Sequence, residues 1–281
     1  MSILNYSLHD LAFLAFDLET TGLNVAQDRI VEIGACRFTG DDKLAEQRYT
    51  QVVNPHQVMS PEVIQVHHIS QQVVDAAPDF DVAYEGFLKL AENTVLVAHH
   101  AAFDISFLKA EAARLGAELP ALFVIDTFPL AKACFPEAPS FALGRLMAHL
   151  GLVMEGDAHR ALPDAMACQA LFKACLRQAE AQDVTLADFY ERFPRTRLDT
   201  QVEAEQSELW NCLQQALNQQ TTISICYTNS RKKQQQREIT PLFLGGHGLY
   251  TYVDAFCHLR QAHRRFYFSR ITECKKKLSN D

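Results

Sequence analysis

The chain changes from apolar to acidic and polar residues within one short stretch, Phe13-Leu14-Ala15-Phe16-Asp17-Leu18-Glu19-Thr20-Thr21-Gly22. The four apolar residues are typical of a strand that is buried on both faces of a sheet. Asp17 and Glu19 follow at once, and residues two apart in an extended chain point to the same side. Such a pair occurs in solvated acidic turns, but two acids at a strand end also repel each other unless a hard cation such as Mg²⁺ or Mn²⁺ neutralises them.

Two later segments supply further acids in a similar setting. Asp104 falls in the first turn of a helix predicted over 102–115, directly after the strand-like residues 95–98. Pro163 predicts another helix start, which places Asp164 in the first turn and His159 on the loop before it. A loop histidine with a pKa near neutrality suits a general base. Taken singly, the acids are also typical of helix starts, and the histidine of a surface position.

The order of the predicted elements indicates two domains. Strands and helices alternate along residues 1–193, which predicts an α/β domain with a mixed sheet flanked by helices. Residues 194–207 are polar and are interpreted as a linker, and residues 208–281 as a small, mostly β domain that opens with a helix over 208–218. The predicted strands are 13–16, 29–38, 48–53, 95–98, 122–126, 223–227, 238–244, 249–257 and 264–271; further helices are predicted from Ser60-Pro61-Glu62 and over 80–90, 141–150 and 163–179.

Composition excludes several classes of protein. A chain of 281 residues that is 48% apolar suits two folded domains rather than a disordered or fibrous one. The early apolar run is too short to span a bilayer and no basic segment precedes it, so we expect no membrane contact and a cytoplasmic location. The eight cysteines include no C-x-x-C pair, so we expect reduced thiols that serve as packing residues.

Charge is distributed unevenly along the chain. Residues 201–281 carry 11 Lys and Arg against 7 Asp and Glu, a net charge of +4, and the first 200 residues carry −12. The acidic part argues against a polyanionic partner, whereas the basic part favours one. A divalent cation bound by the acids would reduce this conflict, because it cancels negative charge at the site.

Three segments together resemble the motifs of the DnaQ-like DEDDh exonucleases, a family that includes the proofreading epsilon subunit of bacterial DNA polymerase III. They are Phe16-Asp17-Leu18-Glu19-Thr20-Thr21-Gly22, Val97-Ala98-His99-His100 with Phe103-Asp104, and His159 with Asp164. The resemblance covers residues 10–180. It implies a ribonuclease H-like fold and 3′→5′ exonuclease activity, with two ions of Mg²⁺ or Mn²⁺ held by Asp17, Glu19, Asp104 and Asp164. His159 is then the base that activates the attacking water.

The same resemblance implies which residues contact the substrate. It assigns Thr20, Thr21 and Leu23 to the terminal nucleotide, and we add His100 and Phe103 from the second motif. The segment Val66-His67-His68-Ile69 resembles the family's V-H-G-I, which adds His67, although the segment also fits an ordinary end of an amphipathic helix. His68 stands where the family has glycine, and His100 where it usually has asparagine.

Four segments of the second domain are similar to the WYL domain: residues 223–227, 237–241, 251–257 and 264–271. That resemblance implies an SH3/Sm-like β-barrel that binds nucleic acids or nucleotide-type ligands. Arg237, Arg264 and Arg270 stand where the family carries arginine, with Tyr252 among them, while Thr251 and Val253 replace the family's tryptophan and leucine. Arginines suit phosphates and aromatic rings suit stacking, but solvated arginines around a barrel core are the alternative.

Two functional hypotheses follow. The first is a metal-dependent 3′→5′ exonuclease that releases nucleoside monophosphates from a single-stranded 3′ end of DNA or RNA, with a WYL domain that binds nucleic acid or a nucleotide. It allows for a polymerase or a repair protein as partner. The second is a ligand-sensing or nucleic-acid-binding regulatory protein in which the WYL domain dominates and the nuclease is weak.

Overall fold

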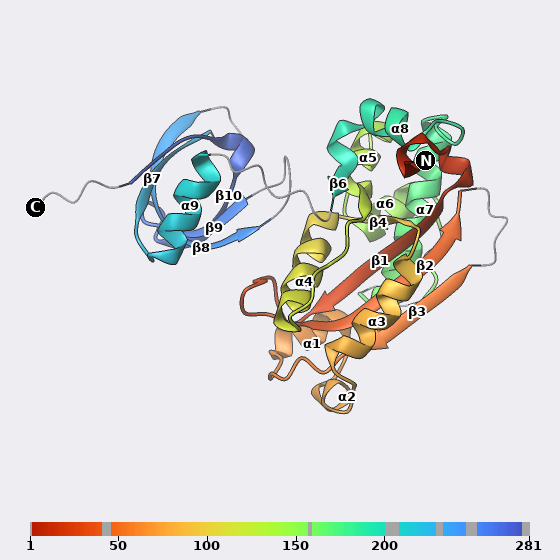
Figure 1. The fold of residues 1–281 in the computed structure, drawn as a ribbon, viewed down its shortest axis with the longest axis horizontal. Helices are drawn as coiled ribbons and strands as arrows, with labels where there is room; N and C mark the ends of the chain where they lie inside the picture. The colour runs from red at the N-terminus through yellow and green to blue at the C-terminus, as the bar shows by residue number, and fades with distance from the viewer. Residues whose placement is uncertain are drawn as a thin grey trace, which may run out of the picture. The chain divides into compact units, whose positions relative to one another are not determined.

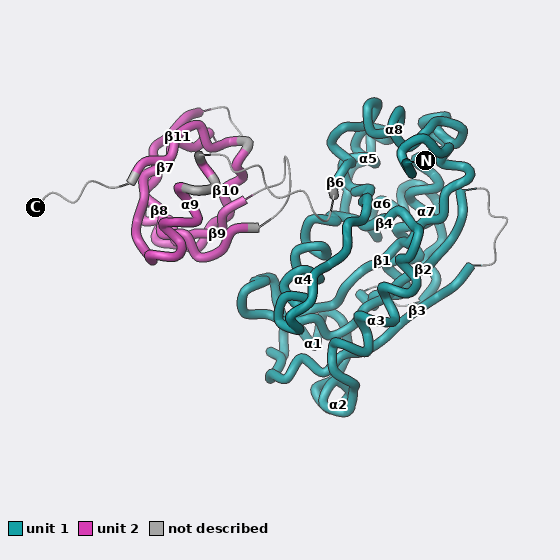
Figure 2. The backbone as a smooth tube through the Cα atoms, viewed as in Figure 1, with its two compact units in different colours: residues 1–201 teal, residues 202–281 magenta. Residues whose placement is uncertain are grey.

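The computed structural model describes residues 2–40, 46–156, 159–199, 208–228, 233–245 and 252–276. The chain divides into two compact units, residues 1–201 and 202–281 (Figure 2). Each unit has a sheet and an apolar core of its own. Among the described residues, no helix has both the length and the apolar character needed to cross a membrane.

Unit 1 is built on a six-stranded mixed sheet with the order β3-β2-β1-β4-β5-β6 (Figure 1). The central strand β1 runs antiparallel to β2 and parallel to β4, and β5 continues the parallel part. The mixed sheet flanked by helices is the α/β fold that the sequence predicts. The strands are β1 (Ala12–Thr20), β2 (Ile30–Thr39), β3 (Gln47–Val52), β4 (Val95–Ala98), β5 (Phe123–Asp126) and β6 (Arg197–Asp199).

Helices cover both faces of β1. The Phe16 ring meets Phe87 of α3 at 5.3 Å between centroids, whereas Phe13 meets Phe172 of α7 at 5.1 Å. Because positions 13 and 16 differ by an odd number of residues, α3 and α7 lie against opposite faces (Figure 1). The helices are α1 (Pro61–His67), α2 (Gln71–Asp75), α3 (Phe80–Ala91), α4 (Ala101–Arg114), α5 (Thr127–Cys134), α6 (Leu143–His149), α7 (Ala161–Gln178) and α8 (Leu186–Arg192).

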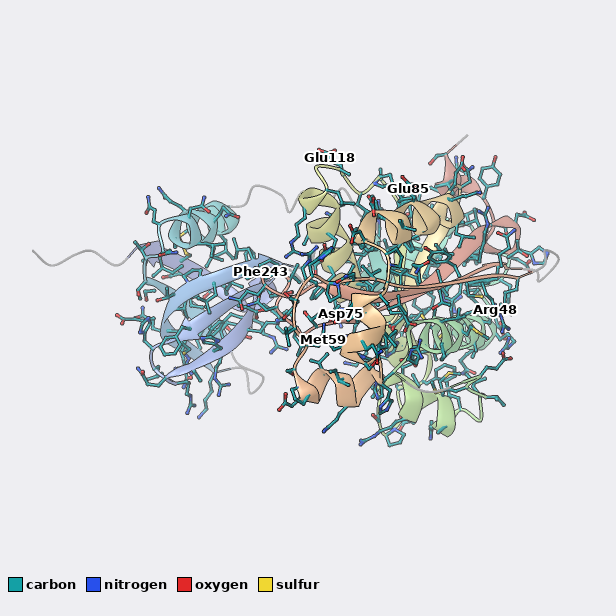
Figure 3. The ribbon with its side chains drawn as sticks, turned by 90° about the horizontal axis from the view of Figure 1, so that it is seen from below. Arg48, Met59, Asp75, Glu85, Glu118 and Phe243 are labelled. Carbon is teal, nitrogen blue, oxygen red and sulfur yellow. A yellow bond between two sulfur atoms is a disulfide. The ribbon has the colours of Figure 1, made fainter. Side chains whose placement is uncertain are left out.

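Local sequence signals explain how α1 begins. The Ser60 side chain accepts a hydrogen bond from the Val63 N–H, and Pro61 occupies the first turn, where a missing N–H costs nothing. A small apolar cluster that includes Met59 (labelled in Figure 3) then packs α1 and α2 against β2. The predicted start of this helix at Ser60-Pro61-Glu62 is therefore confirmed.

Residues 194–199 are not a linker. They form a 3₁₀ turn, η3 (Pro194–Thr196), followed by β6, which pairs with the edge of β5. The strand is short and polar because an edge strand is held through backbone hydrogen bonds, and only Leu198 of its side chains is described as buried. The rest of the predicted linker, 200–207, lies outside the described residues.

Unit 2 packs one helix on a five-stranded antiparallel sheet with the order β10-β9-β8-β7-β11. The elements are α9 (Glu208–Asn218), β7 (Ile223–Thr228), β8 (Gln234–Gly245), β9 (Tyr252–Cys257), β10 (Ala262–Tyr267), η5 (Phe268–Arg270) and β11 (Ile271–Lys276). The run predicted as one strand over 264–271 is two strands, which η5 separates. In the described part of the chain the edge strands β10 and β11 are not paired with each other, so the expected barrel is an open sheet.

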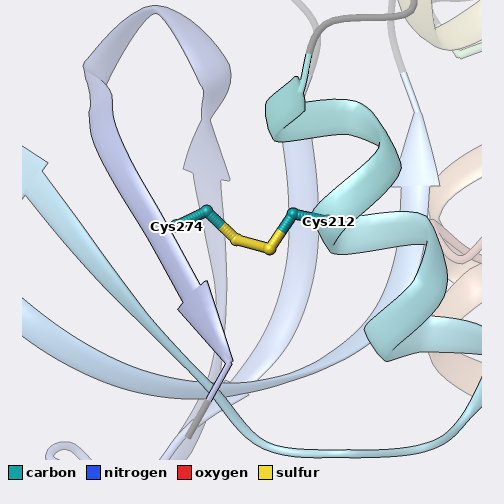
Figure 4. The surroundings of a disulfide bond; sticks show 2 residues. All are labelled: Cys212 and Cys274. Carbon is teal, nitrogen blue, oxygen red and sulfur yellow. A yellow bond between two sulfur atoms is a disulfide. The ribbon is translucent and has the colours of Figure 1, made fainter.

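The expectation of reduced cysteines fails at one pair. Cys212 of α9 and Cys274 of β11 form a disulfide with their Cα atoms 6.7 Å apart (Figure 4). Their separation of 62 residues carries no spacing signal, and only the docking of α9 beside β11 brings them together. The other six thiols are free, and four of them are buried as packing residues: Cys36, Cys168, Cys175 and Cys257.

Candidate active site

Three carboxylates converge where β1 ends and α7 begins. One oxygen from each of Asp17, Glu19 and Asp164 lies within 4.8 Å of the others. The extended backbone of β1 points Asp17 and Glu19 to one side, as their spacing predicts. Asp104, in the first turn of α4, is 3% exposed and interacts electrostatically with Asp17. The structure thus brings together four acids from three distant segments.

The acids raise one another's pKa. Burial raises the pKa of Asp17 well above its ordinary value, and Asp104, Glu19 and Asp164 raise it further by repulsion. Burial and the charges of Asp164 and Glu32 raise the pKa of Glu19 to about 8. Burial also raises the pKa of Asp104 and Asp164. A cluster that resists ionisation by itself is suited to divalent cations, which favour the charged form of hard oxygen ligands.

His159 is exposed on the segment that leads into α7. Its backbone is left-handed, with φ at +60°, and its N–H donates to Asp164 Oδ2 at 3.1 Å. The helix begins at Ala161, two residues before Pro163, because the missing N–H of a proline is tolerated throughout the first turn. The backbone bond therefore places the predicted base and the last acid side by side.

The threonines beside the acids shape their own loop. Thr20 Oγ1 donates to the Gly22 carbonyl at 2.6 Å, and Thr21 Oγ1 accepts from the Arg29 N–H at 3.0 Å. Leu23 is instead 75% exposed. Of the three contact residues predicted in this loop, Leu23 is the one with an exposed side chain.

His67 is a buried histidine with a polar ring atom that is unpaired among the described residues. The ring is 1% exposed, and its Nδ1 accepts a hydrogen bond from the Ile69 N–H at 3.0 Å. Burial lowers the pKa of His67, so the ring is neutral and its proton sits on Nε2. That Nε2–H has no hydrogen-bond partner among the described residues.

His100 begins α4 in a left-handed conformation, with φ at +67°. Its N–H donates to Asp126 Oδ1 at 3.0 Å, and its ring lies 3.7 Å from that of Phe128. Burial, with His99 and Lys132 nearby, lowers the pKa of His100 to about 4, so the ring is a neutral stacking surface. Phe103, by contrast, packs on Phe107 at 4.8 Å.

Asp126 is a site residue that the sequence analysis did not identify. It is 2% exposed at the end of β5, and burial raises its pKa to about 6. The N–H groups of His100 and Phe128 donate to its Oδ1. It therefore holds the starts of α4 and α5 rather than offering a free ligand. The sequence did carry a signal for it, because Asp126 is an acid at the end of the strand predicted over 122–126.

The residues predicted to bind a ligand in unit 2 do not share one face. Arg264 pairs with Ala255 in the sheet, and Arg237 pairs with Ile225, so both lie on the face that carries the core. Tyr252 is three residues from Ala255 and points to the opposite face. The predicted set is therefore divided between the two faces of the sheet, with Arg237 and Arg264 on one and Tyr252 on the other.

Arg265, the residue next to Arg264, lies against Tyr252, where the sequence predicts Arg264. Arg265 lies 3.7 Å over the Tyr252 ring and donates from Nε and Nη2 to the Asp254 carboxylate at 2.9 and 2.8 Å. Arg270 lies 5.8 Å over Tyr267, which pairs with Tyr252. Phe243 (labelled in Figure 3) also approaches Tyr252, at 6.3 Å. Tyr252, Arg265, Tyr267 and Arg270 therefore form an outer-face cluster, which shares Tyr252 and Arg270 with the predicted set.

The sequence of unit 1 matches known nucleases and polymerase subunits. Residues 14–172 match the family model described as Exonuclease (RNase_T). The chain is 35% identical to the DNA polymerase III subunit epsilon of Treponema pallidum (strain Nichols) over 181 residues, 63% of this chain and 83% of that protein. It is 32% identical to the PolC-type DNA polymerase III of Clostridium perfringens (strain 13 / Type A) over 173 residues, 62% of this chain but 12% of that protein.

Solved structures agree in fold. Exonuclease X in complex with 5′ overhanging duplex DNA superposes with a TM-score of 0.50 at 25% identity and covers 63% of this chain and 98% of its own. The nuclease domain of 3′hExo, a DEDDh family member bound to rAMP, gives a TM-score of 0.55 at 18% identity and covers 64% of this chain and 98% of its own.

Residues 208–276, in unit 2, match the WYL domain model. The chain therefore belongs to the Exonuclease family and joins its exonuclease domain to a WYL domain.

Proposed function

We propose that unit 1 hydrolyses the terminal phosphodiester at a single-stranded 3′ end of DNA or RNA and releases a nucleoside monophosphate. Asp17, Glu19, Asp104 and Asp164 would hold two ions of Mg²⁺ or Mn²⁺, which supply Lewis-acid stabilisation of the phosphoryl group when bound. The observation that carries this proposal is the cluster of Asp17, Glu19 and Asp164. Asp104 interacts with it electrostatically, and the protein alone disfavours the charged forms of all four acids.

His159 would act as the base. Its exposure leaves the ring accessible to water, and its N–H bond to Asp164 places it at the edge of the acid cluster. We assign to it the removal of a proton from the water that attacks the phosphorus atom. Asp164 would serve both as a ligand and as the anchor of the histidine backbone.

Substrate contacts would come from two sides of the cluster. Leu23 is exposed for apolar contact, and the loop shaped by Thr20 and Thr21 presents it. The neutral Nε2–H of His67 lacks an acceptor within the described part of the chain. On the other side, the ring of His100 can stack on a base. Phe103 would support that side through its packing on Phe107.

Unit 2 would hold nucleic acid or a nucleotide on its outer-face cluster, through Tyr252 and Arg265 with Tyr267 and Arg270. We further propose that the chain works beside a polymerase or a repair protein, as the epsilon subunit's name indicates for that relative. The alternative of a regulatory protein dominated by the WYL domain has no specific observation in its favour.

A time course tests the nuclease proposal. Single-stranded DNA and RNA, labelled at either end, are incubated with Mg²⁺ or Mn²⁺, and products are separated by length. We expect a 5′-labelled strand to shorten stepwise and a 3′-labelled strand to lose its label as a mononucleotide at once. His159→Ala protein should leave both intact. Cleavage by the His159→Ala variant at the wild-type rate, or internal cuts alone, would overturn the proposal.

A further inference from the structure

Glu32 is a buried carboxylate that faces the start of α7. It lies on β2 opposite Glu19 of β1 and is 1% exposed. Its Oε1 accepts from Arg160 Nη2 at 2.6 Å, and its Oε2 accepts from Arg160 Nε at 3.0 Å and from the Ala161 N–H at 3.0 Å. One carboxylate thus binds both the side chain before α7 and the first N–H group of that helix.

A glycine on the same strand lets α7 approach. Gly34 lies two residues from Glu32, on the same side of β2, and pairs with Asp17 across the sheet. A Cβ at Gly34 would overlap the backbone of Ala161 and Leu162. The start of α7 therefore packs closely on β2 at Gly34 and is hydrogen-bonded to it at Glu32.

The location of Glu32 calls for a reason other than packing. Its charge raises the pKa of Glu19, which works against the acid cluster, and a buried charge is costly unless it is paired. Its partner Arg160 immediately follows His159, whose left-handed backbone is intrinsically unfavourable. The carboxylate thus fixes the one residue that joins the base to the helix.

We infer that Glu32 is a positioning residue for the nuclease reaction, acting through Arg160 to hold His159 and Asp164 at the acid cluster. This inference rests on the proposed function of the site. It assigns to β2, which contributes none of the proposed metal ligands, control over the orientation of the base.

A second ion pair in unit 1 provides a matched control. Arg29 donates from Nε and Nη2 to Glu111 at 2.6 and 2.9 Å, the Glu111 side chain is 2% exposed, and the Ile30 N–H also donates to it at 3.4 Å. This pair joins the residue before β2 to α4 and does not involve the start of α7. Loss of a buried charge has the same general cost in both places, so only the effect on turnover separates them.

The experiment compares Glu32→Gln with Glu111→Gln in the full chain at saturating Mg²⁺. Both variants should lose thermal stability. We expect Glu32→Gln to lower kcat about 10- to 100-fold, the usual effect of losing a partner of a site residue, with KM within about threefold. Glu111→Gln should keep kcat within about threefold. Equal kcat values in the two variants, or a Glu32→Gln effect confined to KM, would overturn the inference.

Arg160 gives a second series in case Glu32→Gln does not fold. Its side chain is 38% exposed, so changes there are milder. Arg160→Lys keeps the charge but not the two-pronged contact, and we expect kcat to fall in the order wild type, Arg160→Lys, Arg160→Met. Equal kcat in all three would overturn the inference. A wild-type chain without metal-dependent nuclease activity would instead refute the proposed function.

Discussion

The two units differ in whether their clustered charged side chains are neutralised within the protein. In unit 1, Asp17, Glu19 and Asp164 crowd together and remain electrostatically incomplete without a cation. In unit 2, the guanidinium of Arg265 is already bound by the Asp254 carboxylate and covered by the Tyr252 ring. An incomplete site gains from binding, whereas a satisfied one must first give up a partner. We therefore expect strong dependence on ligand in unit 1 and weaker dependence in unit 2.

The largest effect is expected from Asp17→Asn. The amide keeps the shape of the side chain but not the charge that holds cations, so exonuclease activity should fall by about three orders of magnitude or more, measured as initial rate at saturating Mg²⁺. In EDTA its melting temperature should equal or exceed that of the wild type, because a repelled carboxylate is gone. Asp81→Asn, at an exposed position of α3, is the control and should retain full activity.

The disulfide tests whether unit 2 is stable independently of unit 1. Closing a loop of 62 residues between Cys212 and Cys274 should stabilise unit 2 by about 4 kcal/mol in the chain-entropy model. Reduction with dithiothreitol should therefore lower the melting transition of unit 2 and leave nuclease activity unchanged. Cys274→Ala should mimic reduction and become insensitive to the reductant. A shared transition that moves as a whole would contradict the separation of the units.

Metal should stabilise unit 1 in a pH-dependent way. In the metal-free fold, burial and neighbouring acids raise the pKa of Glu19 from 4.5 to about 8. The folded state then binds more protons than the unfolded chain in this window, so stability in EDTA should fall as pH rises from 4.5 to 8. Mg²⁺ at about 100 times its dissociation constant adds about 2.7 kcal/mol, and it competes best where protons are scarce.

Scanning calorimetry at pH 5.5 and pH 8 measures this effect. The Mg²⁺-induced rise in melting temperature should be larger at pH 8 and should be absent from the transition of unit 2. Asp104→Asn should reduce it, since that substitution removes one of the four proposed ligands. An equal rise in both units would show unspecific binding of the ion.

Disturbing the packing of α7 on β2 should lower the stability of unit 1 by a smaller but measurable amount. Gly34→Ala places a methyl group into the backbone of Ala161 and Leu162, and overpacking of this kind costs about 1–3 kcal/mol. Gly144→Ala is the matched control, because its added Cβ has a nearest neighbour at 3.8 Å on an exposed part of α6. That change should stabilise unit 1 by about 0.5–1 kcal/mol, as alanine does in helices. Urea unfolding of both variants measures the difference.

The contrast between the units also explains what the sequence could predict. Ser60 and Pro61 mark a helix start through local chemistry, and the apolar run before Asp17 marks a buried strand; both predictions are confirmed. Asp104 meets Asp17 and Glu19 because the parallel strands β4 and β1 end at one edge of the sheet, a consequence of topology that tolerates small errors in the boundaries. Neither conclusion depends on the exact residue at which an element begins.

Other features depend on information that the sequence does not carry locally. Arg264 and Arg265 are adjacent, and which of them joins Tyr252 depends on strand register, where a shift of one residue exchanges the faces. β6 is held by backbone pairing to β5 and has little apolar patterning of its own. The Cys212–Cys274 bond depends on how α9 packs on the sheet, which no spacing rule predicts.

The smallest effect separates the adjacent arginines of β10. Arg264→Ala and Arg265→Ala remove the same charge one residue apart, on opposite faces of the sheet. Binding of a labelled oligo(dT) in EDTA, followed by fluorescence anisotropy, should weaken about fivefold in Arg265→Ala and less than twofold in Arg264→Ala, because only Arg265 lies against Tyr252. Both variants should lose a similar part of the salt dependence, since each removes one positive charge. A stronger loss in Arg264→Ala would place the ligand on the core-bearing face, where Arg237 and Arg264 of the predicted set lie. Equal losses would reduce the role of unit 2 to unspecific attraction. The outcome therefore decides whether the sheet face or the net charge of unit 2 carries its binding.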